Sequence, residues 1–399
     1  MKKVLSVVLA CAMTLSLAAC GSSSSTGSAA GSASASGSTA ASAASSAAPA
    51  SSAASSTTSA AASTASTTSS STTDVAFVTD VGNIDDQSFN QYSWEGVQDF
   101  CKQNGLNANY YRPSEDSDAA RLEQMDNAIK DGAKAVVMAG YLFAPALEQA
   151  QAKYPDVCFL ALDVSTGDLA DPASNTALIT YKEEQCGYLA GYAAVTDGYK
   201  NLGFLGGMAV PAVIRYGYGF VQGADAAAKA MNLTDVKIRY WYSGGFQATD
   251  DVKAKMDSWY SDGTEVVFSC GGPVCNSCVA AAQANNGKMI GVDVDQSGLD
   301  PCVITSAMKA LASSVNLALT DAFNNNWKFT DAYGGKETKL GAAENGVGLP
   351  METSKFNTFS QEQYDTLFKG LADGTLVVDD SFDTAKTPAV TNVTVDYES

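Results

Sequence analysis

Short polar and aromatic clusters follow apolar stretches at several places in this sequence. Residues 79–96, TDVGNIDDQSFNQYSWEG, bring acids, a phenylalanine and an asparagine directly after an apolar run. Glycines, a phenylalanine and an aspartate end comparable runs at 244–246, 271–272 and 292–293. Carboxylates accept hydroxyl hydrogens, aromatic rings offer flat apolar faces, and glycine lets a ligand approach the backbone. These residue types indicate a site for a small molecule.

The sequence contains no histidine. This excludes serine–histidine triads, histidine metal sites and acid–base catalysis by imidazole. Carboxylate pairs remain, namely Asp85 with Asp86 and Asp293 with Asp295. A nucleoside hydrolase or glycosidase needs two carboxyl groups about 5–10 Å apart, which such pairs could supply. This enzyme is kept as an alternative, but the main prediction is a protein without catalytic residues.

Four cysteines in the second half of the chain have a suggestive spacing. Cys270, Cys275 and Cys278, followed by Cys302, resemble the arrangement of a plant-type iron–sulfur site. However, Cys270 ends an apolar stretch, and Cys275 and Cys278 lie about one helical turn apart where the next helix is expected to begin. Buried thiols or a Cys275–Cys278 disulfide are the alternatives that we favour. No metal or other cofactor is expected.

The N-terminal region predicts export and anchoring. Two lysines and an apolar stretch form residues 1–19, which end in Leu-Ala-Ala before Cys20, as in a secretory signal. This ending resembles a bacterial lipobox, which implies cleavage before Cys20 and lipidation of its sulfur. Residues 20–73 consist almost entirely of Ser, Ala, Thr and Gly and predict a flexible tether. We therefore expect a lipid-anchored protein on the extracytoplasmic face of the cell membrane.

The charge balance argues against one class of partner. The chain has 24 basic and 43 acidic residues, with a formal net charge of −19. Nucleic-acid phosphates attract the opposite balance, so no nucleic-acid partner is expected. A solvated acidic surface explains the composition.

After the tether, short β-rich runs alternate with helix-like segments such as 118–132 and 276–287. Continuously apolar strands separated by helices indicate parallel sheets covered on both faces. Ten strands suit two sheets better than one, so the predicted fold is α/β with two doubly wound lobes joined by a hinge. The expected strands are 75–80, 107–112, 135–140, 157–164, 176–181, 202–208, 237–243, 265–270, 289–295 and 302–308.

The same pattern predicts how the chain is divided between the lobes. Lobe 1 is expected to contain residues 74–183 and about 300–340, and lobe 2 residues 184–299 and about 341–399. The hinge crossings are then expected near 181–184, 295–301 and 341–350. In open parallel sheets, ligands bind beyond the carboxyl ends of the strands, which is where the polar and aromatic clusters occur.

Five stretches together resemble the basic membrane protein (BMP) family, the nucleoside-binding lipoproteins of bacterial ABC transporters. They lie in order along nearly the whole chain after the tether. The resemblance implies the two-lobed type I periplasmic-binding-protein fold and a role without bond-making chemistry. The matching stretches are residues 78–96, 202–227, 242–255, 290–296 and 304–311.

The resemblance assigns roles to the first cluster. The family's acid before Ser-Phe-Asn falls on Asp86, and its Phe-Asn pair falls on Phe89 and Asn90. In the family the phenylalanine stacks on the nucleobase and the asparagine hydrogen-bonds its edge. From the residues alone, Phe89 would instead be expected to pack under the sheet at the start of a helix.

The resemblance also assigns roles in the other clusters. Phe246 is the preferred second stacking ring, and Tyr216 is its rival. Asp293 matches the acid that accepts ribose hydroxyls, Asp163 a ligand-contacting acid in lobe 1, and Lys309 a lysine that reaches the sugar. The alternatives without a role in ligand binding are that Asp293 caps a helix or turn and that Lys309 is a solvated surface lysine.

One glycine site departs from the family pattern. Gly272 is expected to offer backbone to the ligand, but Pro273 follows where the family usually has a small residue. Proline has no N–H to donate, so position 273 offers no backbone donor to a ligand.

The sequence therefore predicts an extracytoplasmic substrate-binding lipoprotein of an ABC importer. We expect it to capture a nucleoside, in particular a purine nucleoside, and to deliver it to a membrane permease. The alternative within the same fold is a protein that binds a sugar or a furanose signal, because sugar faces also stack on aromatic rings.

Overall fold

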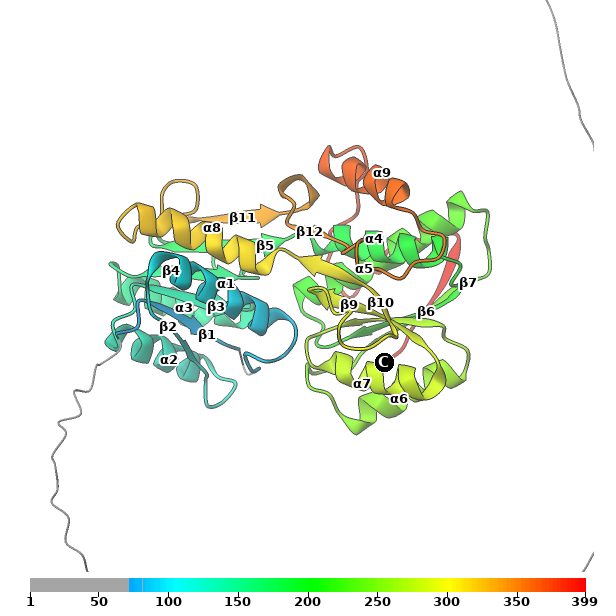
Figure 1. The fold of residues 1–399 in the computed structure, drawn as a ribbon, viewed down its shortest axis with the longest axis horizontal. Helices are drawn as coiled ribbons and strands as arrows, with labels where there is room; N and C mark the ends of the chain where they lie inside the picture. The colour runs from blue at the N-terminus through cyan, green and yellow to red at the C-terminus, as the bar shows by residue number, and fades with distance from the viewer. Residues whose placement is uncertain (1–71, 81) are drawn as a thin grey trace, which may run out of the picture. The chain divides into compact units, whose positions relative to one another are not determined.

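The structure is a computed structural model that describes residues 72–80 and 82–399. The predicted signal peptide, Cys20 and nearly all of the predicted tether lie outside these residues. No helix in the described ranges is long and apolar enough to cross a membrane. The described residues form two sheets with helices on both faces, which confirms the predicted α/β architecture (Figure 1).

The first sheet has six strands, in the order β11-β5-β4-β3-β1-β2, and every neighbouring pair is parallel. We call this sheet with its helices lobe 1. Its elements are β1 (Val75–Val78), α1 (Phe89–Asn104), β2 (Ala108–Tyr111), α2 (Asp118–Lys130), β3 (Ala135–Ala139), η1 (Tyr141–Phe143), α3 (Ala144–Lys153), β4 (Cys158–Leu162), β5 (Thr176–Tyr181), α8 (Leu311–Asn324) and β11 (Lys336–Leu340).

The second sheet has seven strands, in the order β12-β10-β9-β8-β6-β7-β13, and only β12 is antiparallel to its neighbour among the described strands. With its helices it forms lobe 2. Its elements are α4 (Glu183–Thr196), β6 (Asn201–Gly206), α5 (Pro211–Ala230), β7 (Val236–Tyr242), α6 (Asp250–Ser261), β8 (Val266–Cys270), α7 (Val274–Asn285), β9 (Lys288–Asp293), β10 (Val303–Lys309), η2 (Ala342–Glu344), β12 (Val347–Gly348), α9 (Gln361–Ala372) and β13 (Val393–Tyr397).

Strand alternation explains why each sheet needs helices on both faces. Successive strand residues point to opposite faces, and all four residues of β1 are fully buried. Phe77 packs against Trp94 of α1, with ring centroids 6.1 Å apart, whereas Val78 belongs to the core on the other face, with Met125 of α2. Figure 1 shows α1 beside α8 and α6 beside α7.

The structure corrects one predicted boundary. The segment from about residue 300 was expected in lobe 1, with a crossing near 295–301, but β10 pairs with β9 in the second sheet. The chain crosses only after Lys309, where α8 begins at Leu311 and packs beside α1. The other two crossings follow β5 and β11, close to their predicted places.

Helices α4 and α5 approach each other unusually closely because glycines line their contact. A Cβ on Gly191 of α4 would lie 2.0 Å from the Phe220 carbonyl oxygen, and one on Gly219 of α5 would lie 2.1 Å from the Glu184 carbonyl oxygen. Only glycine permits this backbone approach. The close contact fixes the start of α4 against the first turns of α5, and both contribute charged side chains to the site described next.

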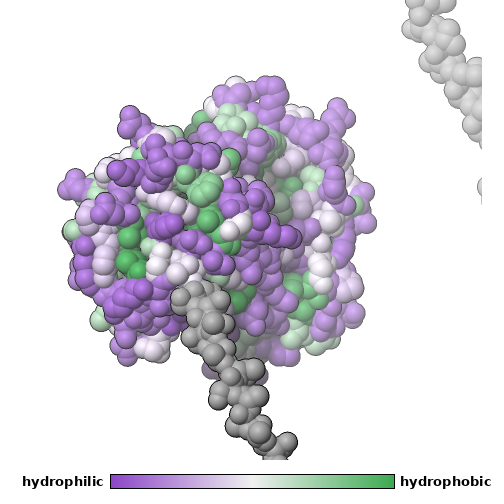
Figure 2. Space-filling view, turned by 60° about the vertical axis from the view of Figure 1, so that its left-hand side comes forward, coloured by the Kyte–Doolittle hydropathy of each residue, from purple (hydrophilic) through white to green (hydrophobic). Residues whose placement is uncertain are grey.

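The surface agrees with the composition. On the face in Figure 2, hydrophilic residues predominate and hydrophobic residues form small separate patches. The acidic charge of this chain is therefore consistent with a solvated exterior.

Candidate functional site

A cavity with about 930 Å³ of empty space, including its open mouth, is lined by residues that follow strands of both sheets. All nine residues that the sequence analysis proposed as ligand contacts line this cavity: Asp86, Phe89, Asn90, Asp163, Tyr216, Phe246, Gly272, Asp293 and Lys309. The rule that ligands bind beyond the carboxyl ends of parallel strands explains why distant sequence clusters meet here.

Asp86 organises the start of α1. Its carboxylate accepts hydrogen bonds from the backbone N–H groups of Ser88, Asn90 and Gln91 at 2.9–3.0 Å. These N–H groups belong to the first turn, which has no intrahelical acceptors for them. The Ser88 hydroxyl is free for another partner and donates to Asp293 at 2.7 Å.

We expect Asp86→Ala to lower the free energy of unfolding by about 1–3 kcal/mol, because buried N–H groups would lose their acceptors. The exposed neighbour Asp85 provides a matched control. Asp85→Ala should change stability by less than about 0.5 kcal/mol. Urea unfolding followed by circular dichroism measures both, and equal effects would contradict the capping role.

The Asn90 side chain forms hydrogen bonds with two aspartates of the protein. Its amide nitrogen donates to Asp80 Oδ1 and to Asp86 Oδ2, both at 3.0 Å. Its amide oxygen accepts from the Asp80 backbone N–H at 3.4 Å. Burial raises the pKa of Asp80, although hydrogen bonds from the Gly82 backbone N–H and Asn90 act to lower it. Asn90 therefore connects β1 to α1, in addition to lining the cavity.

Four aromatic side chains line the cavity: Phe89, Tyr141, Tyr216 and Phe246. The three that the sequence analysis proposed as ligand contacts differ in how much ring surface they expose. Phe89 and Phe246 are half-buried and have ring surface available. Tyr216 is only 1% exposed, packs edge-on against Phe268 and donates its hydroxyl to Asp293 at 3.3 Å. The absence of a side chain at Gly207 makes room for Phe246, because a Cβ there would lie 2.4 Å from the ring. This geometry favours Phe246 over Tyr216 as the second stacking ring.

Asp163 and Asp293 occupy corresponding positions in the two sheets. Each follows or ends a strand and has a positive φ, 57° for Asp163 and 67° for Asp293. The left-handed conformation is uncommon for residues other than glycine, and strained residues of this kind cluster at ligand sites. Asp163 Oδ1 is buried and has no hydrogen-bond partner among the described residues. An unpaired buried acceptor is costly, so this oxygen is suited to a ligand donor.

The charge state of these carboxyls follows from burial and one cation. Burial raises the pKa of Asp163 to about 6, although the Lys309 ammonium acts to lower it. Burial also raises the pKa of Asp293, against Lys309 and the Ser88 hydroxyl. Burial acts to lower the pKa of Lys309, but Asp163, Glu183 and Asp293 raise it well above its usual value. At neutral pH Lys309 is charged and Asp163 is predominantly ionised.

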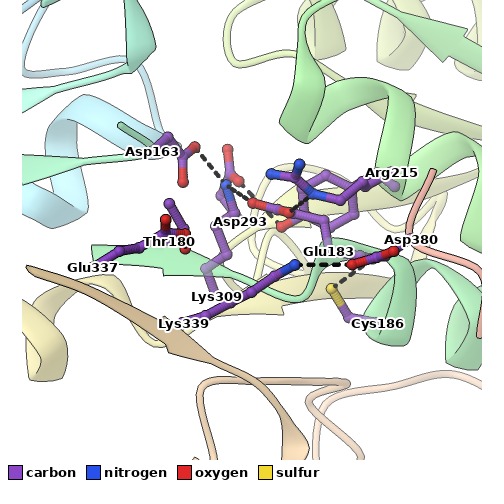
Figure 3. Close-up of polar contacts among 11 residues, drawn as sticks. Asp163, Thr180, Glu183, Cys186, Arg215, Asp293, Lys309, Glu337, Lys339 and Asp380 are labelled. Carbon is purple, nitrogen blue, oxygen red and sulfur yellow. Dashed lines mark hydrogen bonds and ion pairs between the residues drawn. The ribbon is translucent and has the colours of Figure 1, made fainter. Parts of the chain in front are cut away.

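Lys309 is part of a buried chain of ion pairs. Its Nζ lies 2.6 Å from Asp163 Oδ2 and 3.1 Å from Glu183 Oε1. Glu183 Oε2 lies 2.7 Å from Arg215 Nε. Figure 3 shows the ammonium between Asp163 and Glu183, with Arg215 on the other side of Glu183. The predicted alternative of a solvated surface lysine is wrong, because the Lys309 side chain is 2% exposed.

The glycine and cysteine positions raised by the sequence lie on or beside β8, α7 and β10. Gly272 has φ 55°, so it turns the chain between β8 and α7 beside the cavity. Cys270, Cys275, Cys278 and Cys302 are all free and buried, so the structure shows thiols instead of the alternative disulfide. No cluster of potential metal ligands occurs within residues 72–80 and 82–399.

Sequence reasoning missed Glu183 and Arg215. Both precede or interrupt apolar helical stretches, and because charged residues are mostly exposed, neither stands out in the sequence. Full burial of Glu183 becomes visible only when α4, α5 and β10 meet. A weak signal existed, since an acid directly after a crossing strand and an arginine in a glycine-rich helix are unusual combinations.

Comparisons with known proteins identify a family. The family model described as ABC transporter substrate-binding protein PnrA-like (Bmp) matches residues 73–369. Basic membrane protein A1 of Borrelia garinii subsp. bavariensis is 28% identical over 286 residues, covering 69% of this chain and 81% of that protein. The ABC transporter nucleoside-binding protein BmpA of Lactococcus lactis subsp. cremoris is 29% identical over 229 residues, covering 54% and 62% respectively.

A solved structure supports the fold. The ABC transporter solute-binding protein from Aeropyrum pernix K1 superposes with a TM-score of 0.67 at 22% identity. The match covers 78% of this chain and 95% of the other.

Proposed function

The chain belongs to the Bmp family of PnrA-like ABC transporter substrate-binding proteins, and on that premise we propose that it captures a nucleoside, in particular a purine nucleoside, for delivery to a membrane permease. It is a binding protein and not an enzyme, and its partners are a small-molecule ligand and transporter subunits. We further propose lipidation at Cys20, which would hold the protein at the extracytoplasmic face of the membrane.

One observation carries the nucleoside proposal: a cavity that combines aromatic rings with buried carboxylates. Phe89 and Phe246 come from different lobes and offer apolar surface for a base. Base-on-aromatic stacking contributes about 1–3 kcal/mol per base and tolerates different bases. Asp163 and Asp293 offer charged acceptors, which make the stronger hydrogen bonds to hydroxyl groups. The name of the Lactococcus relative, which states nucleoside binding, points the same way.

The three chain crossings supply the proposed hinge. They lie between β5 and α4, between β10 and α8, and between β11 and β12. Because ligand-contacting residues come from both lobes, bending at these crossings would bring Phe89 and Phe246 together on a base. Closure of this kind buries the ligand and changes the surface presented to the permease.

Thermal melting of the protein with different ligands tests the proposal. A ligand that binds only the folded state raises the melting temperature by mass action. Adenosine, guanosine, inosine and uridine should raise it, with the largest shift from a purine nucleoside, whereas ribose and galactose should leave it unchanged. A shift with a free sugar alone would replace the nucleoside assignment by the sugar alternative.

The proposal also predicts a pH dependence of affinity. Asp163 has a pKa of about 6 in the folded protein, and its ionised form is the better acceptor for ligand hydroxyls. Nucleoside affinity should therefore be constant above about pH 7 and fall as the pH drops through 6. Calorimetric titrations at several pH values measure this, and Asp163→Asn should bind more weakly and lose the fall near pH 6. A fall of equal size in that variant would contradict the assignment.

The stability of the ligand-free protein should depend on the ionisation of Asp163 in the opposite sense to its affinity for the ligand. A carboxyl whose pKa is raised by folding binds its proton more tightly in the native state. The contribution of Asp163 to ligand-free stability is therefore greatest below its unfolded pKa and is lost as the pH rises through 6. Affinity and ligand-free stability should consequently respond to Asp163 in opposite directions.

A further inference from the structure

We propose that Glu183 is a positioning residue of this site: it holds the Lys309 ammonium on the Oδ2 side of Asp163, so that Asp163 keeps its other oxygen for the ligand. The inference rests on the proposed function, because the oxygen that it keeps available is one that a nucleoside hydroxyl would use. Glu183 itself does not line the cavity, so its effect on a ligand would pass through Lys309.

The position of Glu183 is fixed by the fold. It is the first residue of α4, directly after the crossing from β5, and its side chain is fully buried. The two carboxylate oxygens bind different cations, Lys309 through Oε1 and Arg215 through Oε2. Burial acts to raise the pKa of Glu183, but Lys309 and Arg215 lower it. Glu183 is therefore an anion that joins two cations.

Arg215 holds Glu183 from the side away from the cavity. It lies on α5, whose glycine-lined contact with α4 sets the distance between the two helices. The guanidinium lies 5.7 Å from the Phe382 ring centroid, and the Arg215 side chain is 11% exposed. A rigid guanidinium is suited to a buried ion pair of this kind. The ion pairs thus join two cations, Lys309 and Arg215, to two acidic side chains, Glu183 and Asp163.

The second carboxylate changes what Lys309 can do. The ammonium donates to Asp163 Oδ2 and also contacts Glu183, while Asp163 Oδ1 stays unpaired among the described residues. The ring centroids of Phe89, Tyr181 and Tyr216 lie 5.1–5.4 Å from the ammonium and restrict its movement.

Without the charge of Glu183, the nearest remaining anions are Asp163 and Asp293, which both line the cavity. The ammonium would then move toward these two carboxylates, which are the acceptors proposed for the ligand, because a buried cation is attracted to the remaining anions. Loss of the Glu183 charge should therefore weaken ligands that need these acceptors, and spare ligands that do not.

The first test needs no ligand. Nitrogen NMR of the full chain can follow the Lys309 ammonium, with Lys309→Arg to assign its signal. Glu183→Gln should shift this signal or broaden it, whereas Glu184→Gln, the same change one residue along, should leave it in place. Glu184 is also buried, but no contact joins it to Lys309 among the described residues. An unchanged signal in Glu183→Gln would overturn the inference.

The second test separates positioning from general damage. Calorimetry would compare adenosine, guanosine and inosine with their 2′,3′-dideoxy forms. Glu183→Gln should weaken the nucleosides by about tenfold, the effect of losing one charge-assisted hydrogen bond. It should change the affinity of the dideoxy forms by less than about twofold, and Glu183→Asp should recover part of the loss. Equal weakening of both ligand sets would indicate a merely structural role and overturn the proposal.

The two proposals can fail separately. If the wild-type protein binds none of the three nucleosides, the proposed function fails, and the Lys309 signal alone decides whether Glu183 holds the ammonium. If nucleosides bind and Glu183→Gln leaves both signal and affinity unchanged, the function stands and the positioning role is refuted.

Discussion

Lys309→Met is expected to lower the free energy of unfolding by about 3–5 kcal/mol, the typical cost of removing one partner from a buried ion pair. The variant would leave Asp163 and Glu183 without the cation that lies 2.6 and 3.1 Å from them. Because a carboxyl can take up a proton when its cation is removed, the loss should be smaller at pH 5 than at pH 8.

A second lysine provides the matched control. Lys339 forms an ion pair with Asp380 at 3.0 Å, but the two side chains are 34% and 61% exposed. Exposed pairs contribute about 0–1 kcal/mol, so Lys339→Met should change stability by no more than that. Urea unfolding at both pH values measures the two variants. Similar losses of stability for both lysines would show that the buried ion pairs of Lys309 contribute no more to stability than an exposed pair.

Phe89→Ala is expected to weaken nucleoside binding by about 1–3 kcal/mol, which corresponds to roughly 5- to 150-fold in Kd. The reason is loss of the flat ring at the cavity wall. Calorimetric titration of the best purine nucleoside measures the effect, and the melting temperature of the ligand-free variant shows how much stability is lost independently.

Phe89→Leu distinguishes stacking from packing. Leucine keeps most of the apolar volume at the start of α1 but has no π-face. If Phe89 stacks on a base, the leucine variant should bind nearly as weakly as the alanine variant while retaining more stability. Wild-type affinity in Phe89→Leu would support the simpler interpretation, in which Phe89 only packs at the start of the helix.

Much of the fold is predictable from the sequence because its strands are buried on both faces. The ten predicted strands all occur and agree within two residues at each end, since apolar runs bounded by turn residues have few alternatives. The strands that were not predicted are β11, β12 and β13. β11 reads KETKL and β13 is largely exposed, so neither has the apolar signature of a central strand. They are edge strands whose pairing depends on tertiary context.

The misplaced lobe boundary has a similar cause. Nothing local in residues 303–309 shows which sheet the strand will join. In the structure it pairs in parallel with β9 of the second sheet. The chain therefore crosses between the lobes in the short connection from Lys309 to Leu311. Crossings of this kind depend on the whole topology and not on the residues at the crossing.

The candidate site also contains residues that the sequence predicts and residues that it does not. Strand-end residues such as Asp163, Phe246 and Asp293 could be located because topology gathers strand ends at one edge. The internal hydrogen bonds of Asp86 and Asn90 could not be foreseen, because they depend on the shape of the turn before α1. Sequence motifs also do not predict Glu183 and Arg215 behind the cavity wall, since their burial results from packing between separate elements.

A crystal structure of the protein with the purine nucleoside that gives the largest melting shift would show whether a nucleoside binds in this cavity with its base on Phe89. We predict the base between Phe89 and Phe246, and ribose hydroxyls donating to Asp293 and to Asp163 Oδ1. A nucleoside bound elsewhere, or bound here with its base away from Phe89, would contradict the account.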